Sequence, residues 1–342
     1  MLPIYIKIIK VRCMDMEQYR PPFDITDEML GKISEIMENL GELRAVRDLD
    51  KLPRLRKVNR IKSIHSTLAI EDNSLSMGQV TDILGGVRVQ GDKDDILAVK
   101  NAVKAYDLIG KVDVFDLRDL LRVHGVMMDG LVSEAGQIRS GQVGVYNESG
   151  EVIYLAPPAQ LVRGQLVQLL DWVKNSNVNM LIKSSVFHYE FEFLHPFRDG
   201  NGRMGRLWHT ALLSSWRDIF EWIPVESIIK DNQEEYYRAI AYSTSQAKSN
   251  IFVEFMLDVI SDAVKQLKKD AFNHTKSINR QVQKLLEVMD YYPQTAEELM
   301  KKLNLKSRNG FRVNYINPAL ELGCIKRTEP KAKSKKQKYY KV

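Results

Sequence analysis

The sequence predicts a mainly α-helical protein with one β-hairpin near the middle of the chain and a small basic domain at its C-terminus. Three observations lead to this fold class. Apolar residues recur at helical spacing over most of the 342 residues, the stretch Gly136–Pro158 alternates apolar and polar residues instead, and the positive charge is concentrated after Ser277. A chain of this length is long enough for two or three domains.

The helical pattern begins at Asp27, and Met29, Ile33, Ile36 and Leu40 all recur at helical spacing. Further segments with the same pattern follow along the chain. The predicted helices are 27–46, 58–70, 96–109, 114–127, 160–174, 181–193, 204–216, 234–242 and 251–267.

Alternation replaces the helical pattern between these segments. Val143 and Val145 before the polar stretch Asn147–Gly150, and Val152 and Tyr154 after it, alternate with polar residues. This pattern is typical of a β-hairpin with a polar turn.

The N-terminal segment Met1–Cys13 suits an edge strand, because Lys7 and Lys10 interrupt its apolar residues and no small-residue cleavage site follows. No run approaches the roughly 20 apolar residues that a membrane-spanning helix needs. The two cysteines, Cys13 and Cys324, are too few for a disulfide framework. These observations favour a cytoplasmic protein without a membrane partner.

A concentrated group of phosphate-binding residue types lies at positions 200–206. Gly200 and Gly202 stand where a helix begins, so free backbone N–H groups and the positive end of the helix dipole can meet an anion. Asn201 can donate a side-chain N–H to a phosphoryl oxygen. Arg203 and Arg206 share a helix face and can both offer bidentate contacts to phosphate.

An acid and a base precede these residues. Asp199 supplies the hard oxygen ligand that suits Mg²⁺ carried in with a polyphosphate. His195 titrates near neutrality and can take a proton from an attacking hydroxyl. A structural turn requires none of the charged members of this group, so the segment predicts a catalytic phosphate site.

The segment His195–Arg206, HPFRDGNGRMGR, resembles the Fic family pattern H-P-F-x-[DE]-G-N-G-R-x-x-R at every specified position. The resemblance implies a helical core, roughly Phe115–Leu257, that transfers AMP from Mg-ATP to a Ser, Thr or Tyr hydroxyl of a target protein. It implies His195 as the general base and Asp199 as the metal ligand. The nucleotide is assigned to Gly200, Asn201, Gly202, Arg203, Met204, Gly205 and Arg206, with Arg206 on the γ-phosphate.

The resemblance extends to two other regions. The hairpin at Val143 and Val145 resembles the family's flap, which presents the target segment by strand addition. The segment Asp231–Tyr237 resembles the lining of the adenine pocket, which assigns Tyr236 and Tyr237 to nucleotide binding.

Residues 67–72 resemble the family's inhibitory motif, [ST]-x-x-x-E-[GN]. Thr67 and Glu71 match, whereas Asp72 stands where Gly or Asn is usual. The resemblance implies that Glu71 pairs with Arg206 and so occupies the guanidinium that the γ-phosphate needs. Read without the family, the same residues would simply end an amphipathic helix.

The C-terminal piece, Ser277–Val342, carries 15 Lys and Arg against 6 Asp and Glu, while the other 276 residues carry 35 against 38. Helices over 278–289 and 307–321, a helix capped by Thr295, and two strands at 324–328 and 338–342 suggest a winged-helix-like domain. DNA and a docking protein are both candidate partners for its basic surface.

The sequence therefore predicts an N-terminal helical region over 1–110, a catalytic core over 111–272 and a winged-helix-like domain over 277–342. The function expected first is an auto-inhibited protein adenylyltransferase with ATP and Mg²⁺ as cofactors. Two alternatives stay open: a phosphotransferase or de-AMPylase on the same fold, and a DNA-binding regulator that uses the core to sense a nucleotide. A homodimer is carried as a further hypothesis.

Overall fold

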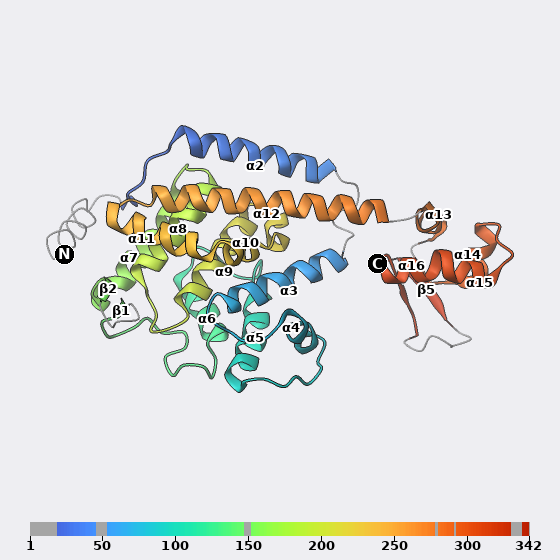
Figure 1. Ribbon diagram of the computed structural model, residues 1–342, viewed down its shortest axis with the longest axis horizontal. Helices are drawn as coiled ribbons and strands as arrows, with labels where there is room; N and C mark the ends of the chain where they lie inside the picture. Colours follow the sequence, from blue (N-terminus) through green and yellow to red (C-terminus); the bar gives the residue numbers. More distant parts are fainter. Residues whose placement is uncertain are drawn as a thin grey trace. The chain divides into compact units, whose positions relative to one another are not determined.

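The computed structural model describes residues 19–45, 53–146, 152–277, 280–290, 292–329 and 337–341 (Figure 1). The strand expected at 1–13 and the polar hairpin turn expected at 147–150 lie outside these residues. The chain divides into two compact units, one formed by Met1–Ile36 and Arg60–Ala263 and the other by Met37–Asn59 and Val264–Val342.

The helices predicted from apolar spacing are present, with shifted ends. Their bounds are α2 Asp27–Ala45, α3 Pro53–Ala69, α5 Lys93–Tyr106, α6 Leu117–Met127, α7 Ala159–Asn175, α8 Met180–Leu194, α9 Asn201–Trp216, α11 Gln233–Gln246 and α12 Asn250–Ser277. The largest shift is at the end of α12, which continues past its predicted end at Leu267 because no Gly or Pro interrupts the residues that follow.

Among the described elements of the first unit, three short helices were not predicted: α4 Met77–Leu84, the 3₁₀ helix η2 Asp218–Trp222, and α10 Val225–Asp231. Each is too short to repeat an apolar period more than once or twice. α4 nevertheless carries a local start signal, because Ser76 and Gln79 form a capping box around its first turn.

The predicted hairpin consists of β1 Gly144–Tyr146 and β2 Val152–Leu155, which pair antiparallel with Val145 opposite Tyr154. The register shifts between Val145 and Tyr146. The carbonyl of Val143 accepts a further hydrogen bond from the Ala156 N–H at 3.0 Å, which closes the open end of the hairpin.

The core of the first unit is built around the α8–α9 pair, which lies toward the middle of this unit in Figure 1. α8 is buried along almost its whole length and on all sides, because it is a core helix without a polar face. One continuous apolar cluster contains residues from α3 and α5 as well as from α7, α8 and α9. The N-terminal helices and the motif-bearing helices therefore share one core, which fixes α3 against α9.

The C-terminal part has its own apolar core, with Val282, Phe311 and Ile325 among its members. It contains α13 Arg280–Val288, α14 Ala296–Lys302, and a third helical stretch made of α15 Arg308–Phe311, the π-helical turn η3 Arg312–Ile316 and α16 Asn317–Glu321. Thr295 and Glu298 form the predicted capping box of α14.

The predicted C-terminal strands are β4 Ile325–Arg327 and β5 Lys338–Lys341. A third strand that was not predicted, β3 Gln294–Thr295, pairs with β5, so the sheet order is β3-β5-β4 and both pairings are antiparallel. Two residues are too few to show an alternating pattern in the sequence.

Candidate active site

The loop between α8 and α9 places His195 at the end of one helix and Gly200 at the start of the next. His195 caps α8 with φ +47°, and Gly200 precedes α9 with φ +81°. Both angles lie in the left-handed region, and at Gly200 an added Cβ would also lie 2.6 Å from Met128 Sδ. The turn therefore requires glycine at position 200.

The side chain of Asn201 holds this loop in shape. Its Oδ1 accepts from the Phe197 N–H and its Nδ2 donates to the Phe197 carbonyl, both at 2.9 Å. The sequence did not reveal this structural role, and the phosphate contact expected for Asn201 stays a prediction. The backbone N–H groups at the start of α9 are then the donors that this turn offers to an anion.

Met204 and Gly205 also have structural roles. Met204 is fully buried in the apolar core. A Cβ at Gly205 would collide with Glu192 Oε1 and with the His188 ring, so glycine lets α8 approach α9 closely. Neither residue lines the cavity beside the motif.

His124, on α6, is a positioning residue that the sequence did not reveal. Its Nδ1 accepts from the Gly136 N–H at 2.8 Å, so its proton lies on Nε2, which faces the Asp199 carbonyl at 3.0 Å. Burial lowers the pKa of His124 to about 4, which keeps the ring neutral. The ring also stacks on Phe197 with the centroids 3.5 Å apart.

Arg139 connects the base of the hairpin to the same loop. Its guanidinium donates to the His195 carbonyl at 2.7 Å through Nε and to the Pro157 carbonyl at 2.6 Å through Nη2. The Arg139 N–H donates to the Pro196 carbonyl at 2.9 Å. The hairpin and the candidate base are therefore tied to one buried side chain.

His195 itself is suited to accept a proton. Burial is the largest influence on its pKa and lowers it below the ordinary histidine value, so the imidazole is neutral at pH 7. A neutral imidazole beside a cavity can act as a general base toward a bound hydroxyl.

The cavity at this motif has a volume of about 510 Å³ and brings together residues from both halves of the first unit. Of the residues predicted from the sequence, His195, Gly202, Arg206, Glu71, Tyr236 and Tyr237 line it. The remaining lining residues, Glu192, Phe193, Ile240, Ala241 and Thr244, were not predicted. The last three follow Tyr237 along α11 and make one wall largely apolar, as a nucleobase pocket would be.

The two tyrosines lie differently in this wall. Tyr236 is buried, and its hydroxyl lies 3.0 Å from His188 Nε2. Tyr237 is 47% exposed and opens to solvent. Tyr237 is therefore the freer ring of the two.

Glu192 was not predicted because it stands on a helix that is otherwise core. It lies one turn before His195 on α8, and burial raises the pKa of its carboxyl to about 8. The site thus contains two carboxyl groups in different environments: the Glu192 side chain is 11% exposed, and the Glu71 side chain is 30% exposed beside Arg206.

Asp199 and Arg203 open into a second, smaller hollow of about 220 Å³. Arg203 Nη2 lies 3.2 Å from Asp199 Oδ2, and the Asp199 side chain is 55% exposed. The Nε–H of Arg203 is buried and has no hydrogen-bond partner among the residues that the structure describes, so it is free to donate to a phosphate oxygen.

These residues fit a magnesium ion that enters with a polyphosphate. Mg²⁺ in such sites is held by one or two carboxylates and by the phosphates of the substrate, and Asp199 offers one accessible carboxylate. The described part of the chain contains no cluster of three or more His, Cys, Asp or Glu that could hold a metal without a substrate.

Glu71 lines both hollows. Its Oε1 lies 2.6 Å from Arg206 Nη2, and Arg206 also donates to Thr67 Oγ1 and to the Thr67 carbonyl, each at 3.0 Å. Arg206 is 1% exposed, so the end of α3 and the turn that follows it supply an acidic partner and two neutral acceptors to a buried cation. Glu71 comes to this point because Gly202 has no side chain: a Cβ there would lie 2.5 Å from Glu71 Oε1.

The residue after Glu71 explains why the inhibitory pattern favours Gly or Asn at that position. Asp72 has φ +61°, in the left-handed region that Gly adopts freely and that Asn and Asp tolerate better than other residues. Aspartate therefore departs from the pattern while keeping its backbone geometry.

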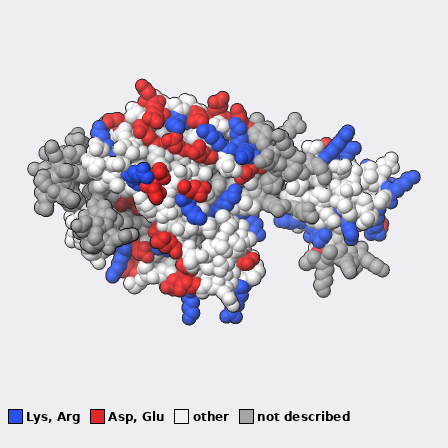
Figure 2. Space-filling model, viewed as in Figure 1, with Lys and Arg blue, Asp and Glu red and all other residues white. Residues whose placement is uncertain are grey.

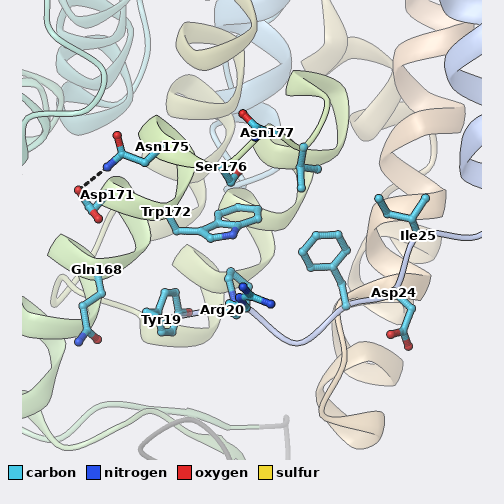
Figure 3. Close-up of a pocket in the computed structure, with 13 residues that line it drawn as sticks. Tyr19, Arg20, Asp24, Ile25, Gln168, Asp171, Trp172, Asn175, Ser176 and Asn177 are labelled. Carbon is cyan, nitrogen blue, oxygen red and sulfur yellow. Dashed lines mark hydrogen bonds between the residues drawn. The ribbon is translucent and has the colours of Figure 1, made fainter. Parts of the chain in front are cut away.

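A larger cavity of about 950 Å³ lies elsewhere in the same unit, between the segment Tyr19–Ile25 and the end of α7 (Figure 3). Phe23 and Trp172 meet edge-on there, with ring centroids 5.8 Å apart. None of the residues from His195 to Arg206 lines it. Chemistry rather than size therefore identifies the candidate active site.

Comparison with known proteins agrees with this geometry. The profile described as "Fic/DOC family" matches residues 114–213, and "Filamentation induced by cAMP protein Fic-like, C-terminal domain" matches residues 280–340. A crystal structure of a Fic family protein from Desulfovibrio desulfuricans G20 is 42% identical, covers 95% of this chain and 98% of its own, and superposes with a TM-score of 0.72. The chain belongs to the Fic family.

More distant relatives share part of the chain. The protein adenylyltransferase fic-1 of Caenorhabditis elegans is 26% identical over 230 residues, and that of Drosophila yakuba, named Fic, is 27% identical over 244 residues. The aligned regions span 42% and 45% of the lengths of these relatives. A solved structure of Fic-1 (residues 134–508) from C. elegans has a TM-score of 0.60 at 20% identity, which shows a common fold. None of the described helices is long and apolar enough to cross a membrane.

Proposed function

We propose that this Fic protein is a protein adenylyltransferase that moves AMP from Mg-ATP to a Ser, Thr or Tyr hydroxyl of a target protein. The observation that carries the proposal is the cavity where a neutral, partly buried His195 and the buried Arg206 face one space of about 510 Å³. Relatives named protein adenylyltransferase support the same reaction.

In the proposed reaction, the target hydroxyl loses its proton to His195 as its oxygen attacks the α-phosphorus. The bond from that phosphorus to the bridging oxygen breaks, and pyrophosphate leaves. Arg203, Arg206 and the N–H groups at the start of α9 hold the phosphates in line. Mg²⁺ held by Asp199 would neutralise charge on the leaving pyrophosphate.

The flap and the apolar wall complete the proposal. We infer that the target segment adds as a strand beside β1, starting near Val143, because the hairpin base is tied to His195 through Arg139. The adenine is assigned to the wall formed by Tyr237, Ile240 and Ala241.

We also propose the cytoplasm as the location of the protein and keep the homodimer as a hypothesis.

Self-inhibition by Glu71 is part of the proposal. An ion pair of 2.6 Å to a cation that is 1% exposed competes with the γ-phosphate for the same guanidinium. Because Glu71 also stands between the two hollows, ATP would bind with its phosphates displaced from the line of attack.

Labelled ATP tests the reaction. The Glu71→Gly protein is incubated with α-labelled or γ-labelled Mg-ATP, and label on the protein itself is measured. Transfer from the α-position alone is expected. Transfer from the γ-position would instead show a phosphotransferase, and a Glu71→Gly/His195→Ala double variant that still transfers α-label would exclude the His195 mechanism.

A further inference from the structure

The third helical stretch of the C-terminal part has one buried and one exposed face. Phe311, Ile316 and Ala319 are buried in the local core. The opposite face presents side chains to solvent, and Val313 on it is 49% exposed. Its exposed members from position 308 to 314 are Arg308, Asn309, Arg312, Val313 and Asn314. A helix packed on its own domain through one face thus presents a mainly polar, basic face without a described covering element.

Positive charge is concentrated in the second half of the sequence of this domain. The segment 301–341 contains 13 Lys and Arg against 2 Asp and Glu, whereas 280–300 contains 2 against 4. Lys and Arg side chains project from this part of the molecule in Figure 2, with few acidic side chains among them. The positive net charge of the domain therefore comes from residues 301–341.

The two arginines of the third helical stretch, Arg308 and Arg312, are weakly engaged within the protein. Arg308 is 76% exposed, and its nearest carboxylate, on the equally exposed Glu297, lies 3.7 Å away. Such surface pairs contribute little and are readily exchanged. Among the residues that the structure describes, Arg312 has no carboxylate partner.

The β4–β5 ribbon lies against the same core. Ile325 of β4 belongs to the apolar cluster that contains Phe311, so the ribbon and the third helix are packed together. Lys326 and Lys338 on the ribbon are exposed. The domain thus carries an exposed helix and a basic two-stranded ribbon.

We propose that this surface binds duplex DNA, with Arg308, Asn309 and Arg312 in the major groove and the lysines of the β4–β5 ribbon on the phosphates. The major groove of B-form DNA admits an α-helix, and Arg and Asn are the side chains that pair with guanine and adenine edges there. Val313 supplies an apolar contact of the kind made to a thymine methyl. Double-stranded RNA fits less well, because its major groove is too narrow and deep for side chains to read.

The test uses the full chain and a fluorescent duplex of about 25 base pairs, which is long enough for one domain and its flanks. Binding anisotropy is measured between about 50 and 200 mM salt, where log K should fall by about 0.9 per phosphate contact for each decade of salt. The double variant Arg308→Ala/Arg312→Ala should bind at least about 10-fold more weakly, since each base contact contributes about 1–3 kcal/mol.

Arg280→Ala/Lys284→Ala is the matched control. Both residues are exposed on α13, and their removal changes the net charge by the same amount. This variant should bind as the unchanged chain does, and the melting temperatures of all three proteins should agree, because every substituted side chain is exposed.

The proposal is overturned by no binding at low salt, by equal weakening in both double variants, or by binding to RNA duplex or single strands as tight as to DNA. Stronger capture of polyglutamate than of DNA would instead show an acidic protein partner. None of these outcomes bears on AMP transfer, so this proposal and the catalytic one fail separately.

Discussion

Replacing Glu71 by Gly removes one contact, the ion pair with Arg206, and the free-energy contribution of that pair follows from its geometry. The pair joins a guanidinium that is 1% exposed to a carboxylate that is 30% exposed, with 2.6 Å between Arg206 Nη2 and Glu71 Oε1. A hydrogen bond to a charged group contributes about 1.5–3 kcal/mol, which corresponds to about 10- to 150-fold in the competition with the γ-phosphate.

Two effects of opposite sign are expected. Without nucleotide, the variant should melt at a lower temperature, because Arg206 is left buried without its ion-pair partner. With Mg-ATP, the γ-phosphate restores a negative partner, so the ATP-induced rise in melting temperature should exceed that of the unchanged protein. AMP transfer, including transfer to the protein itself, should rise by roughly 10²-fold.

The assay measures label from α-labelled ATP together with melting curves, and Asp72→Asn is its control. The Asp72→Asn substitution also removes a carboxylate. Asparagine tolerates the φ of +61° at position 72, and Asp72 makes no ion pair with Arg206 in the structure. Glu71→Asp should restore inhibition poorly because its side chain is shorter. A folded Glu71→Gly protein with unchanged AMP transfer and an unchanged ATP-induced rise in melting temperature would refute self-inhibition by Glu71.

Three further predictions concern single residues. His195→Ala should slow AMP transfer by about 10²–10⁴ while the ATP-induced melting shift persists, because the imidazole serves the nucleophile; transfer at the original rate would remove His195 as the base. Asp199→Ala should lose the magnesium dependence of nucleotide binding, and calorimetry that finds unchanged Mg-ATP affinity would move the metal elsewhere. Glu192 has a folded-state pKa of about 8, above its unfolded value, so its contribution to stability is full at low pH and is lost as pH rises toward 8. The fall in melting temperature from about pH 5 to pH 8 should therefore be shallower in Glu192→Gln, and parallel curves for the two proteins would show that Glu192 is ionised throughout.

The helices and the motif could be predicted from sequence because each depends on local chemistry. α8 and α9 follow from apolar spacing, and the residues between them from turn and phosphate chemistry at adjacent positions. The loop glycine at 200 follows in the same way, since its φ of +81° is a local requirement.

Contacts between segments that are distant in sequence could not be predicted from local patterns. His124 supports the Asp199 carbonyl from 75 residues away, and Arg139 joins His195 to the hairpin across 56. A buried histidine or arginine has no pattern that distinguishes it from any other on a helix or loop. Glu192 was missed for the related reason that its neighbours on α8 are core residues.

Packing gives three motif residues structural roles that the sequence did not reveal. Asn201 bonds to Phe197, Met204 packs in the core, and Gly205 lets α8 approach α9, while their assignment to the nucleotide stays a prediction. Each is fixed by a neighbour that only the folded chain supplies.

The absence of a side chain at Gly202 constrains which mutations this protein can accept. The same bare backbone that leaves room for a phosphate also leaves room for the Glu71 carboxylate, whose Oε1 would lie 2.5 Å from any Cβ at that position. A mutation on α9 that excluded the inhibitor would therefore also damage the substrate site. In a genetic selection for unregulated activity, surviving alleles should fall at positions 67 and 71 and spare positions 202 and 206.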